Sequence, residues 1–294
     1  MVKRFLLLFL FVASVNVHAQ TIEEPQTIQI DDSNLTVEES LLTTKIKTFL
    51  SEESFMQNKD FIKVIFSPES DFYTQDRVDV VKVAHTLKEN GLLNLFFDKP
   101  KELELSFKTS GSALLFVKIL GDTLRNIGYY RYVTSESHLD QSQFTWTIVL
   151  TTEYATDPLI LEKELQKSGC GIIDIVKKNS SSWEYSVDMS RAYLNIPSLI
   201  SDEEIKLKRS LYAHWLEIGS IQDLAIKSSF RDDWYPHITY YDKQLHLLEV
   251  LKKDKKTRNI LLVMPKGSKY IKISDIYTLK NVKDNLILTP SGSR

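Results

Sequence analysis

Few side chains in this sequence are able to carry out covalent chemistry. Cys170 is the single cysteine, and it lies in Ser168-Gly-Cys-Gly171, a pattern typical of a turn between a helix and a strand. The dipole at the start of a helix lowers the pKa of a thiol, whereas the end of a helix has the opposite effect. We therefore expect Cys170 to pack in a turn and not to act as a nucleophile.

Motifs for nucleophilic, metal and phosphate chemistry are also missing. The sequence contains no Gly-x-Ser-x-Gly, no His-Glu-x-x-His, no Cys-x-x-Cys and no glycine-rich phosphate loop. We therefore expect no catalytic residue, no metal and no cofactor. An alternative is that His237 and His246 approach each other across a hairpin beside Asp232, Asp233 and Asp242, where they would form an enzyme or metal site.

The densest cluster of side chains suited to binding follows Phe230. The candidate contact residues are Arg231, Asp232, Asp233, Trp234, Tyr235 and His237. Aromatic side chains and arginine are enriched at the hot spots of protein interfaces, and aromatic rings beside polar groups also stack on sugar rings. The loop therefore has three interpretations. It contacts a protein partner, it binds a glycan, or its aromatic side chains fold back over their own domain.

Residues 1–19 have the pattern of a signal peptide. Lys3 and Arg4 precede an almost unbroken apolar run from Phe5 to Val15, and Ala19 is a small residue of the kind that precedes a cleavage site. The run is shorter than the roughly 20 apolar residues that span a bilayer. We predict cleavage after Ala19 and export to the periplasm, with no transmembrane segment remaining.

Charge and cysteine content narrow the class of protein further. The chain carries 37 basic and 39 acidic side chains, a net charge of −2, whereas nucleic-acid-binding domains are distinctly basic. We therefore expect no nucleic-acid partner. A single cysteine precludes an internal disulfide, and small extracellular domains usually contain several. A bacterial periplasm therefore suits the chain better than an animal extracellular space.

A recurring pattern predicts an α/β body at residues 59–190. Gly91, Gly128 and Gly169 each follow a helix-like stretch and precede a strand-like one, as expected of glycines that end helices. A strand-like run also lies upstream of each, and these runs recur about every 41 residues, which indicates tandem βαβ units. The strand-like runs are 61–66, 102–107 and 144–150, the helices include 76–90 and 113–126, and a final hairpin joins 172–177 to 183–189. Residues 102–189 fit a ferredoxin-like sandwich best.

Two segments flank this body. Residues 20–58 combine a polar arm with an amphipathic helix, which follows the capping-box pattern Thr36-Val-Glu-Glu39. The predicted apolar face of this helix consists of Leu41, Leu42, Ile46, Phe49 and Leu50. Residues 191–209 are predicted to be a linker, with a short acidic helix between Pro197 and Lys208.

The pattern changes at residues 210–294 to the period-two alternation of an all-β sandwich. The predicted strands are 212–218, 223–228, 237–241, 245–251, 258–264 and 270–276. The segments 223–228, 237–242 and 260–273 resemble the strands and turns of bacterial pre-peptidase C-terminal domains. This resemblance implies a jelly-roll fold and a role in attachment to carbohydrate or protein. The insertion 231–236 departs from that family, and no peptidase domain precedes it.

Together these features predict an α+β protein in which βαβ repeats are followed by a β-sandwich. We expect a non-enzymatic periplasmic scaffold or assembly component of a cell-envelope machine, for example a flagellar-motor accessory or a secretion apparatus, by analogy with other small exported modules. Its partners would be other envelope proteins, and a homo-oligomer is compatible with the pattern. The alternatives are a carbohydrate- or peptidoglycan-binding module and, less favoured, an enzyme that uses His237 and the nearby acids.

Overall fold

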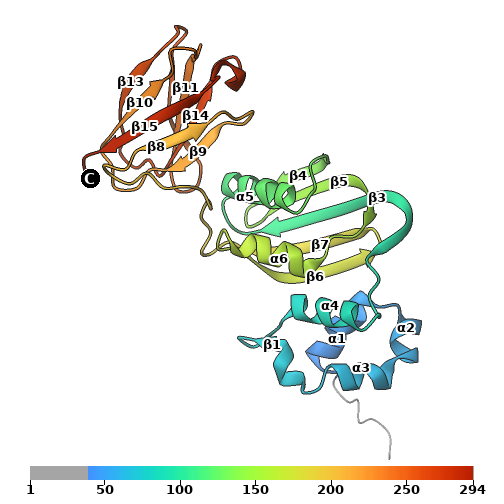
Figure 1. The fold of residues 1–294 in the computed structure, drawn as a ribbon. Helices are drawn as coiled ribbons and strands as arrows, with labels where there is room; N and C mark the ends of the chain where they lie inside the picture. The colour runs from blue at the N-terminus through green and yellow to red at the C-terminus, as the bar shows by residue number, and fades with distance from the viewer. Residues whose placement is uncertain (1–38, 294) are drawn as a thin grey trace, which may run out of the picture. The chain divides into compact units, whose positions relative to one another are not determined.

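The computed structural model of the chain describes residues 39–293, which form a mixed α+β structure (Figure 1). Six α-helices and fifteen β-strands occur in this part of the chain, and most of the ordered elements are strands. The α+β class is therefore confirmed. The predicted signal peptide, the polar arm and Thr36 of the capping-box pattern lie outside the described residues.

Four short helices open the described chain. They are α1 (Leu41–Phe49), α2 (Glu52–Gln57), α3 (Lys59–Ile65) and α4 (Val80–Glu89), with a 3-10 turn η1 (Glu69–Phe72) and a hairpin of β1 (Tyr73–Thr74) and β2 (Arg77–Val78) before α4. Ser40, Ser51 and Asp79 cap three of these helices, because each side chain accepts a hydrogen bond from the backbone N–H three residues later. Helix α1 lies where the amphipathic helix is predicted and buries Leu42, Ile46 and Phe49 of the expected apolar face, whereas Leu41 is exposed.

The strand predicted at residues 61–66 is wrong, because this segment forms helix α3. Ile62 and Phe66 are buried, whereas Phe61 and Val64 are exposed. Burial at a spacing of four residues follows the helical period. A short apolar run such as this one does not distinguish a strand from a helix by periodicity alone.

A five-stranded sheet with two helices forms the next part of the chain. Its strands are β3 (Phe96–Thr109), β4 (Val133–Leu139), β5 (Phe144–Tyr154), β6 (Gly171–Asn179) and β7 (Ser182–Asp188), and its helices are α5 (Ala113–Asn126) and α6 (Pro158–Gln166). The strand order is β4-β5-β3-β7-β6, in which only the β3–β7 pair is parallel. Helices α5 and α6 lie side by side over the sheet (Figure 1).

The three glycines end helices as predicted, but the threefold repeat does not hold. Gly91, Gly128 and Gly169 follow α4, α5 and α6 and have φ angles of 73°, 102° and 70°. The first copy lacks its leading strand, because α3 occupies that position. A strand begins within two residues of the glycine only in the third copy, where β6 starts at Gly171. The sequence therefore contains a recurrent helix stop and not three equivalent βαβ units.

Helix α1 covers the β6 edge of this sheet. Lys45 forms an ion pair with Asp174 of β6 at 2.5 Å, and the ammonium of Lys177 donates to the backbone carbonyl of Phe49 at 2.9 Å. The ring of Phe49 lies 6.2 Å from the ring of Trp183 in the neighbouring strand. The opposite edge of the sheet is β4, whose pairing with β5 is interrupted by a register shift at Ser135.

The C-terminal part is a sandwich of two four-stranded antiparallel sheets, ordered β13-β10-β15-β8 and β12-β11-β14-β9. The strands are β8 (Ile205–Lys208), β9 (His214–Glu217), β10 (Asp223–Ser228), β11 (Pro236–Tyr241), β12 (Leu247–Lys252), β13 (Asn259–Val263), β14 (Tyr270–Asp275) and β15 (Asn285–Ser291). Side chains between the sheets form a hydrophobic core separate from that of the five-stranded sheet. The six predicted strands are present, whereas β8 and β15 are additional.

The acidic helix predicted between Pro197 and Lys208 is wrong. Asp202 has a positive φ of 64°, which is outside the range of a right-handed helix. The residues that follow form β8, which pairs with β15 from Ile205 to Lys208. The acids that resembled a helix start therefore belong to a turn that leads into an edge strand.

We predict that Gly169→Ala strongly destabilises the protein. Gly169 has a positive φ, and a Cβ at this position would overlap the backbone carbonyl oxygen of Arg191. Gly91 is a matched control because its φ is similar and a Cβ added there would meet no atom within 4 Å. Urea unfolding should give a loss of about 1 kcal/mol for Gly91→Ala and a clearly larger loss for Gly169→Ala. Equal losses would contradict the assignment of a steric role to the Arg191 contact.

Candidate functional site

The predicted contact cluster lies at one end of the sandwich, in three loops that we call the loop end (residues 229–235, 253–258 and 276–284). Trp234 does not fit the expected role, because its side chain is 0% exposed. Its indole Nε1 donates to the backbone carbonyl of Ser274 at 3.0 Å. The ring is therefore part of the sandwich core, and the prediction that Trp234 contacts a partner or a sugar is wrong.

A buried carboxylate joins two of the loops. Asp232 is fully buried, and its side chain accepts hydrogen bonds from the backbone N–H groups of Ser229 at 2.8 Å, Lys283 at 2.7 Å and Asp284 at 3.0 Å. Backbone donors in a loop otherwise need water or secondary structure to satisfy them. Asp232 therefore replaces strand pairing at this end of the sandwich and has a structural role.

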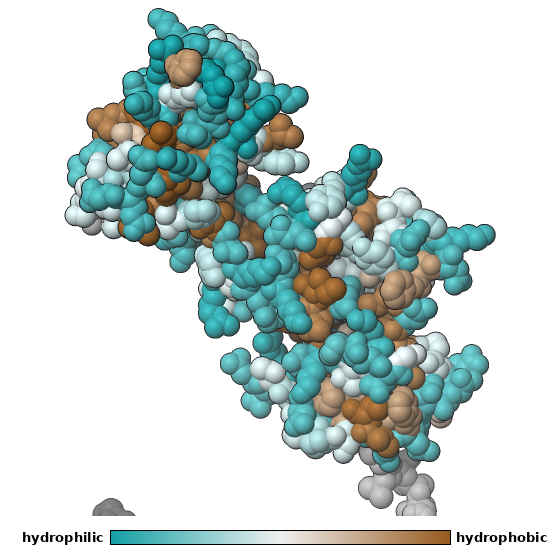
Figure 2. Space-filling model, in the orientation of Figure 1, coloured by the Kyte–Doolittle hydropathy of each residue, from teal (hydrophilic) through white to brown (hydrophobic). Residues whose placement is uncertain are grey.

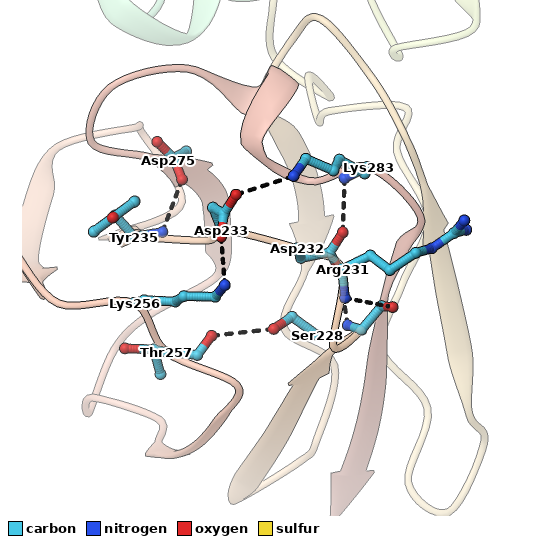
Figure 3. A network of polar contacts seen from close by, with 10 residues as sticks. Ser228, Arg231, Asp232, Asp233, Tyr235, Lys256, Thr257, Asp275 and Lys283 are labelled. Carbon is cyan, nitrogen blue, oxygen red and sulfur yellow. Dashed lines mark hydrogen bonds and ion pairs between the residues drawn. The ribbon is translucent and has the colours of Figure 1, made fainter.

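A second carboxylate and a hydroxyl hold the same end together (Figure 3). Asp275 accepts from the backbone N–H of Tyr235 at 2.8 Å and from that of Thr278 at 2.9 Å. Ser228 Oγ donates to the backbone carbonyl of Thr257 at 3.1 Å. All three loops are thus tied to the strands or to each other by hydrogen bonds to backbone groups.

Ion pairs cover the outside of this network. Asp233 pairs with Lys256 and with Lys283, and hydrogen bonds from these two ammonium groups lower the pKa of its carboxyl group. Arg231 pairs with Asp284 through both carboxylate oxygens. Exposed pairs of this kind contribute little to stability. The ion pairs neutralise the negative charges of Asp233 and Asp284. These two acids therefore do not reduce the positive charge of the other cations at the loop end.

The surface that remains is aromatic and basic. Phe230 is 75% exposed and Tyr277 is 63% exposed, and the Tyr277 ring meets the Tyr235 ring edge to face at 5.1 Å. Four cations, Lys252, Lys253, Lys255 and Arg258, form no ion pair within residues 39–293. The lysine run is visible in the sequence. Nothing in the sequence, however, indicates that Phe230 and Tyr277 are more exposed than Trp234.

The histidines and acids of the enzyme alternative do not converge. His237 lies on β11, where burial and then the charges of Lys252 and Lys272 lower the pKa of its ring. The Nδ1 atom of His246 lies 2.9 Å from Asp242 in a turn. No group of three or more His, Cys, Asp or Glu side chains is arranged to hold a metal ion in the described part of the chain.

A hollow of about 800 Å³ lies elsewhere, beside α4, α6 and β6. Cys170 is in its wall, but the thiol is buried, and burial raises its pKa to about 12. Glu162 is also there, where burial raises the pKa of its carboxyl group while the backbone N–H of Ile172 donates to it at 2.6 Å. A thiol held neutral in this way is a poor nucleophile.

Comparisons with known proteins assign no family to the chain. No protein-family model matches the sequence, and no curated protein matches it either. Among solved structures, a chain from the crystal structure of accessory secretory protein 1, 2 and 3 of Streptococcus pneumoniae is 12% identical over 32% of this chain and 81% of its own length. The TM-score of that match is 0.19, too low to support a shared fold.

Membrane-crossing helices are absent from the part of the chain that the structure describes. No helix between residues 39 and 293 has both the length and the apolar character to cross a bilayer.

We predict that Asp232→Ala destabilises the protein by about 3 kcal/mol, because three backbone N–H groups lose their acceptor in a buried position. Asp233→Ala is the matched control, since it removes a neighbouring carboxylate whose ion pairs are with exposed lysines, and its effect on stability should be much smaller. Urea unfolding measures both values. A small loss in Asp232→Ala would show that the loops do not depend on this carboxylate.

We predict that the thiol of Cys170 is unreactive in the folded protein. Burial and a raised pKa should keep it from reacting with an aromatic disulfide reagent at pH 8, and complete reaction should occur after unfolding in guanidinium chloride. Absorbance of the released thiolate gives the stoichiometry. Rapid modification of the folded protein would contradict the packing role of Cys170.

Proposed function

We propose that this protein is a non-enzymatic scaffold or assembly component of the bacterial cell envelope, exported to the periplasm after cleavage behind Ala19. On this proposal its partner is a protein, and the contact is made at the loop end of the sandwich. The proposal includes the two finer structural expectations, a ferredoxin-like organisation of the five-stranded sheet, with β7 as an additional strand, and a jelly-roll-like sandwich.

The observation that carries the proposal is a set of exposed aromatic rings on rigidly held loops. Aromatic side chains are enriched at the hot spots of protein interfaces. Here Phe230 and Tyr277 extend from loops that Asp232 and Asp275 hold through backbone hydrogen bonds. A surface that is already ordered loses little conformational entropy when a partner binds.

The described chemistry favours binding over catalysis. The loop end contains carboxylates, but they accept hydrogen bonds from backbone N–H groups, from lysines and arginine or, for Asp254, from the hydroxyl of Tyr277. None of them is paired with a histidine or a cysteine. A glycan-binding role loses its main support with the burial of Trp234. A role in attachment to protein remains compatible with the exposed rings and the unpaired cations.

We predict that the double substitution Phe230→Ser and Tyr277→Ser removes binding of the partner. Loss of a hot-spot residue typically costs 2 kcal/mol or more, which is about 30-fold in affinity. Tyr130→Ser is the matched control, because Tyr130 is also 75% exposed but lies outside the sandwich. Tagged full-length protein is recovered after mild crosslinking in cells, and the proteins bound to each variant are quantified by mass spectrometry.

Two outcomes would contradict the proposal. Equal recovery of every bound protein by the double variant and by Tyr130→Ser would remove the loop end from the interface. Retention on purified cell-wall sacculi, with no protein lost from the double variant, would favour the glycan-binding alternative. Both variants should unfold at the same urea concentration as the original chain, which separates binding from folding.

A further inference from the structure

Strand β13 is the free edge of one sandwich sheet. It pairs only with β10, in an antiparallel register that runs without interruption from Asp223 opposite Val263 to Lys227 opposite Asn259. An edge strand presents unpaired N–H and C=O groups that can pair with another chain. Some of these groups in β13 pair with β10, and the others remain available to another chain.

The hydrogen bonds at the two ends of the pair identify the free groups. Ser228 N donates to the carbonyl of Arg258 at 2.8 Å, and Met264 N donates to the carbonyl of Gln222 at 2.9 Å. In an antiparallel pair, hydrogen-bonded positions alternate with positions whose backbone groups face away. The N–H and C=O groups of Asn259, Leu261 and Val263 therefore face away from β10, toward the open side of the sheet.

This edge lacks the devices that usually protect an edge strand. Residues 259–263 contain no proline, no charged residue and no bulge, although charge, proline and bulges are what keep free edges from pairing. The side chains of Leu261 and Val263 are 69% and 67% exposed. They lie on the outer face of the sheet, next to the exposed Ala225 of β10. Figure 2 shows apolar patches on the surface of the sandwich.

The other edges of the two sandwich sheets and of the five-stranded sheet each carry a protecting feature; β1 and β2 form a separate two-residue hairpin. Strand β8 carries the exposed lysines Lys206 and Lys208. Strand β12 has a register shift opposite Tyr240 and Tyr241, and β4 has one at Ser135. The backbone of residues 197–199 covers the end of β9, and α1 covers β6. Among residues 39–293, β13 is thus the edge built for pairing.

Charge at one end of β13 specifies the partner. The loop 253–258 leads directly into the strand, and its Lys253, Lys255 and Arg258 form no ion pair within the described residues. Lys227, opposite Asn259 on β10, is likewise exposed and forms no ion pair in this range. Acidic residues in an added strand would be attracted to this end, whereas a second copy of the chain would bring Lys266, just beyond its own β13, toward it in antiparallel pairing.

We propose that β13 receives an extended segment of a partner protein as an additional strand. The segment has aliphatic residues at alternate positions, which lie beside Leu261 and Val263, and Asp or Glu residues at the end that meets the loop 253–258. Main-chain hydrogen bonds supply the affinity and the side chains supply the selectivity, as in other cases of strand addition. The inference rests on the proposed function and names the chemistry of its partner.

The test uses the full-length chain with a photocrosslinking amino acid at Asn259, irradiated in cells. Mass spectrometry should identify a crosslinked peptide with alternating aliphatic residues and adjacent acids. Leu261→Pro removes an N–H that faces away from β10, so the native ladder is kept while an added strand loses a donor. Crosslink yield should fall by about tenfold in Leu261→Pro and in Leu261→Lys.

Thr289→Lys is the matched control for these variants. Thr289 is exposed on the same face of the sheet, but it lies on the inner strand β15 opposite Ala225, so a lysine there should leave the yield unchanged. Charge reversal of Lys253, Lys255 and Arg258 to Glu should lower the yield and reverse the sign of its dependence on salt, because salt then screens a repulsion. Urea unfolding of every variant shows that the fold is retained.

Three results would overturn the inference, and they are distinguishable from failure of the proposed function. A crosslink to a second copy of the chain would replace partner binding by self-association. A basic or helical crosslinked peptide would refute the stated chemistry. Partner binding could be lost in the Phe230 and Tyr277 variant but unchanged in Leu261→Pro. That result would support the proposed function and refute strand addition at β13. Unchanged partner binding in both variants would refute the proposed function and the inference together.

Discussion

The buried carboxylate of Asp232 is the constraint on which the loop end depends. Strand pairing ends at this side of the sandwich, and the backbone donors beyond it must find other acceptors. One side chain satisfies three of them and joins loops that are about 50 residues apart in the chain. Burial of an acid is costly unless its oxygens are fully hydrogen-bonded, and here they are. Asp232 also fixes the backbone next to Trp234, and this backbone directs the indole ring of Trp234 toward the core.

The same network separates two kinds of side chain that the sequence places together. Asp232, Trp234 and Asp275 point inward and stabilise the end of the sandwich, whereas Phe230 and Tyr277 remain in solvent. Arg231 and Asp233 lie between these groups, on the surface but already paired. The polar and aromatic residues of one short segment thus divide into a scaffold and a presented surface.

The sequence predicts local features of this fold well and nonlocal ones poorly. Strand β10 is predictable because Leu224 and Ile226 alternate with exposed residues over its whole length. Strand β15 is not, because Pro290 argues against a strand, although this proline lies beyond the last pairing with β8. The cluster after Phe230 is a correct signal of an organised loop. Which aromatic ring faces outward depends on Lys283 and Asp284, and no local pattern contains that information.

Among the edge strands of the sandwich and of the five-stranded sheet, β13 alone lacks a protecting feature, and this limits how the protein can assemble. Helix α1 lies on β6 through Lys45 and Lys177, and lysines occupy β8 on the opposite side of the sheet that contains β13. A sheet that is open at both ends can extend indefinitely by adding strands, as fibrils do. A sheet with a single receptive side has a valence of one, so that pairing ends with the first strand it accepts and produces a discrete complex instead of a filament.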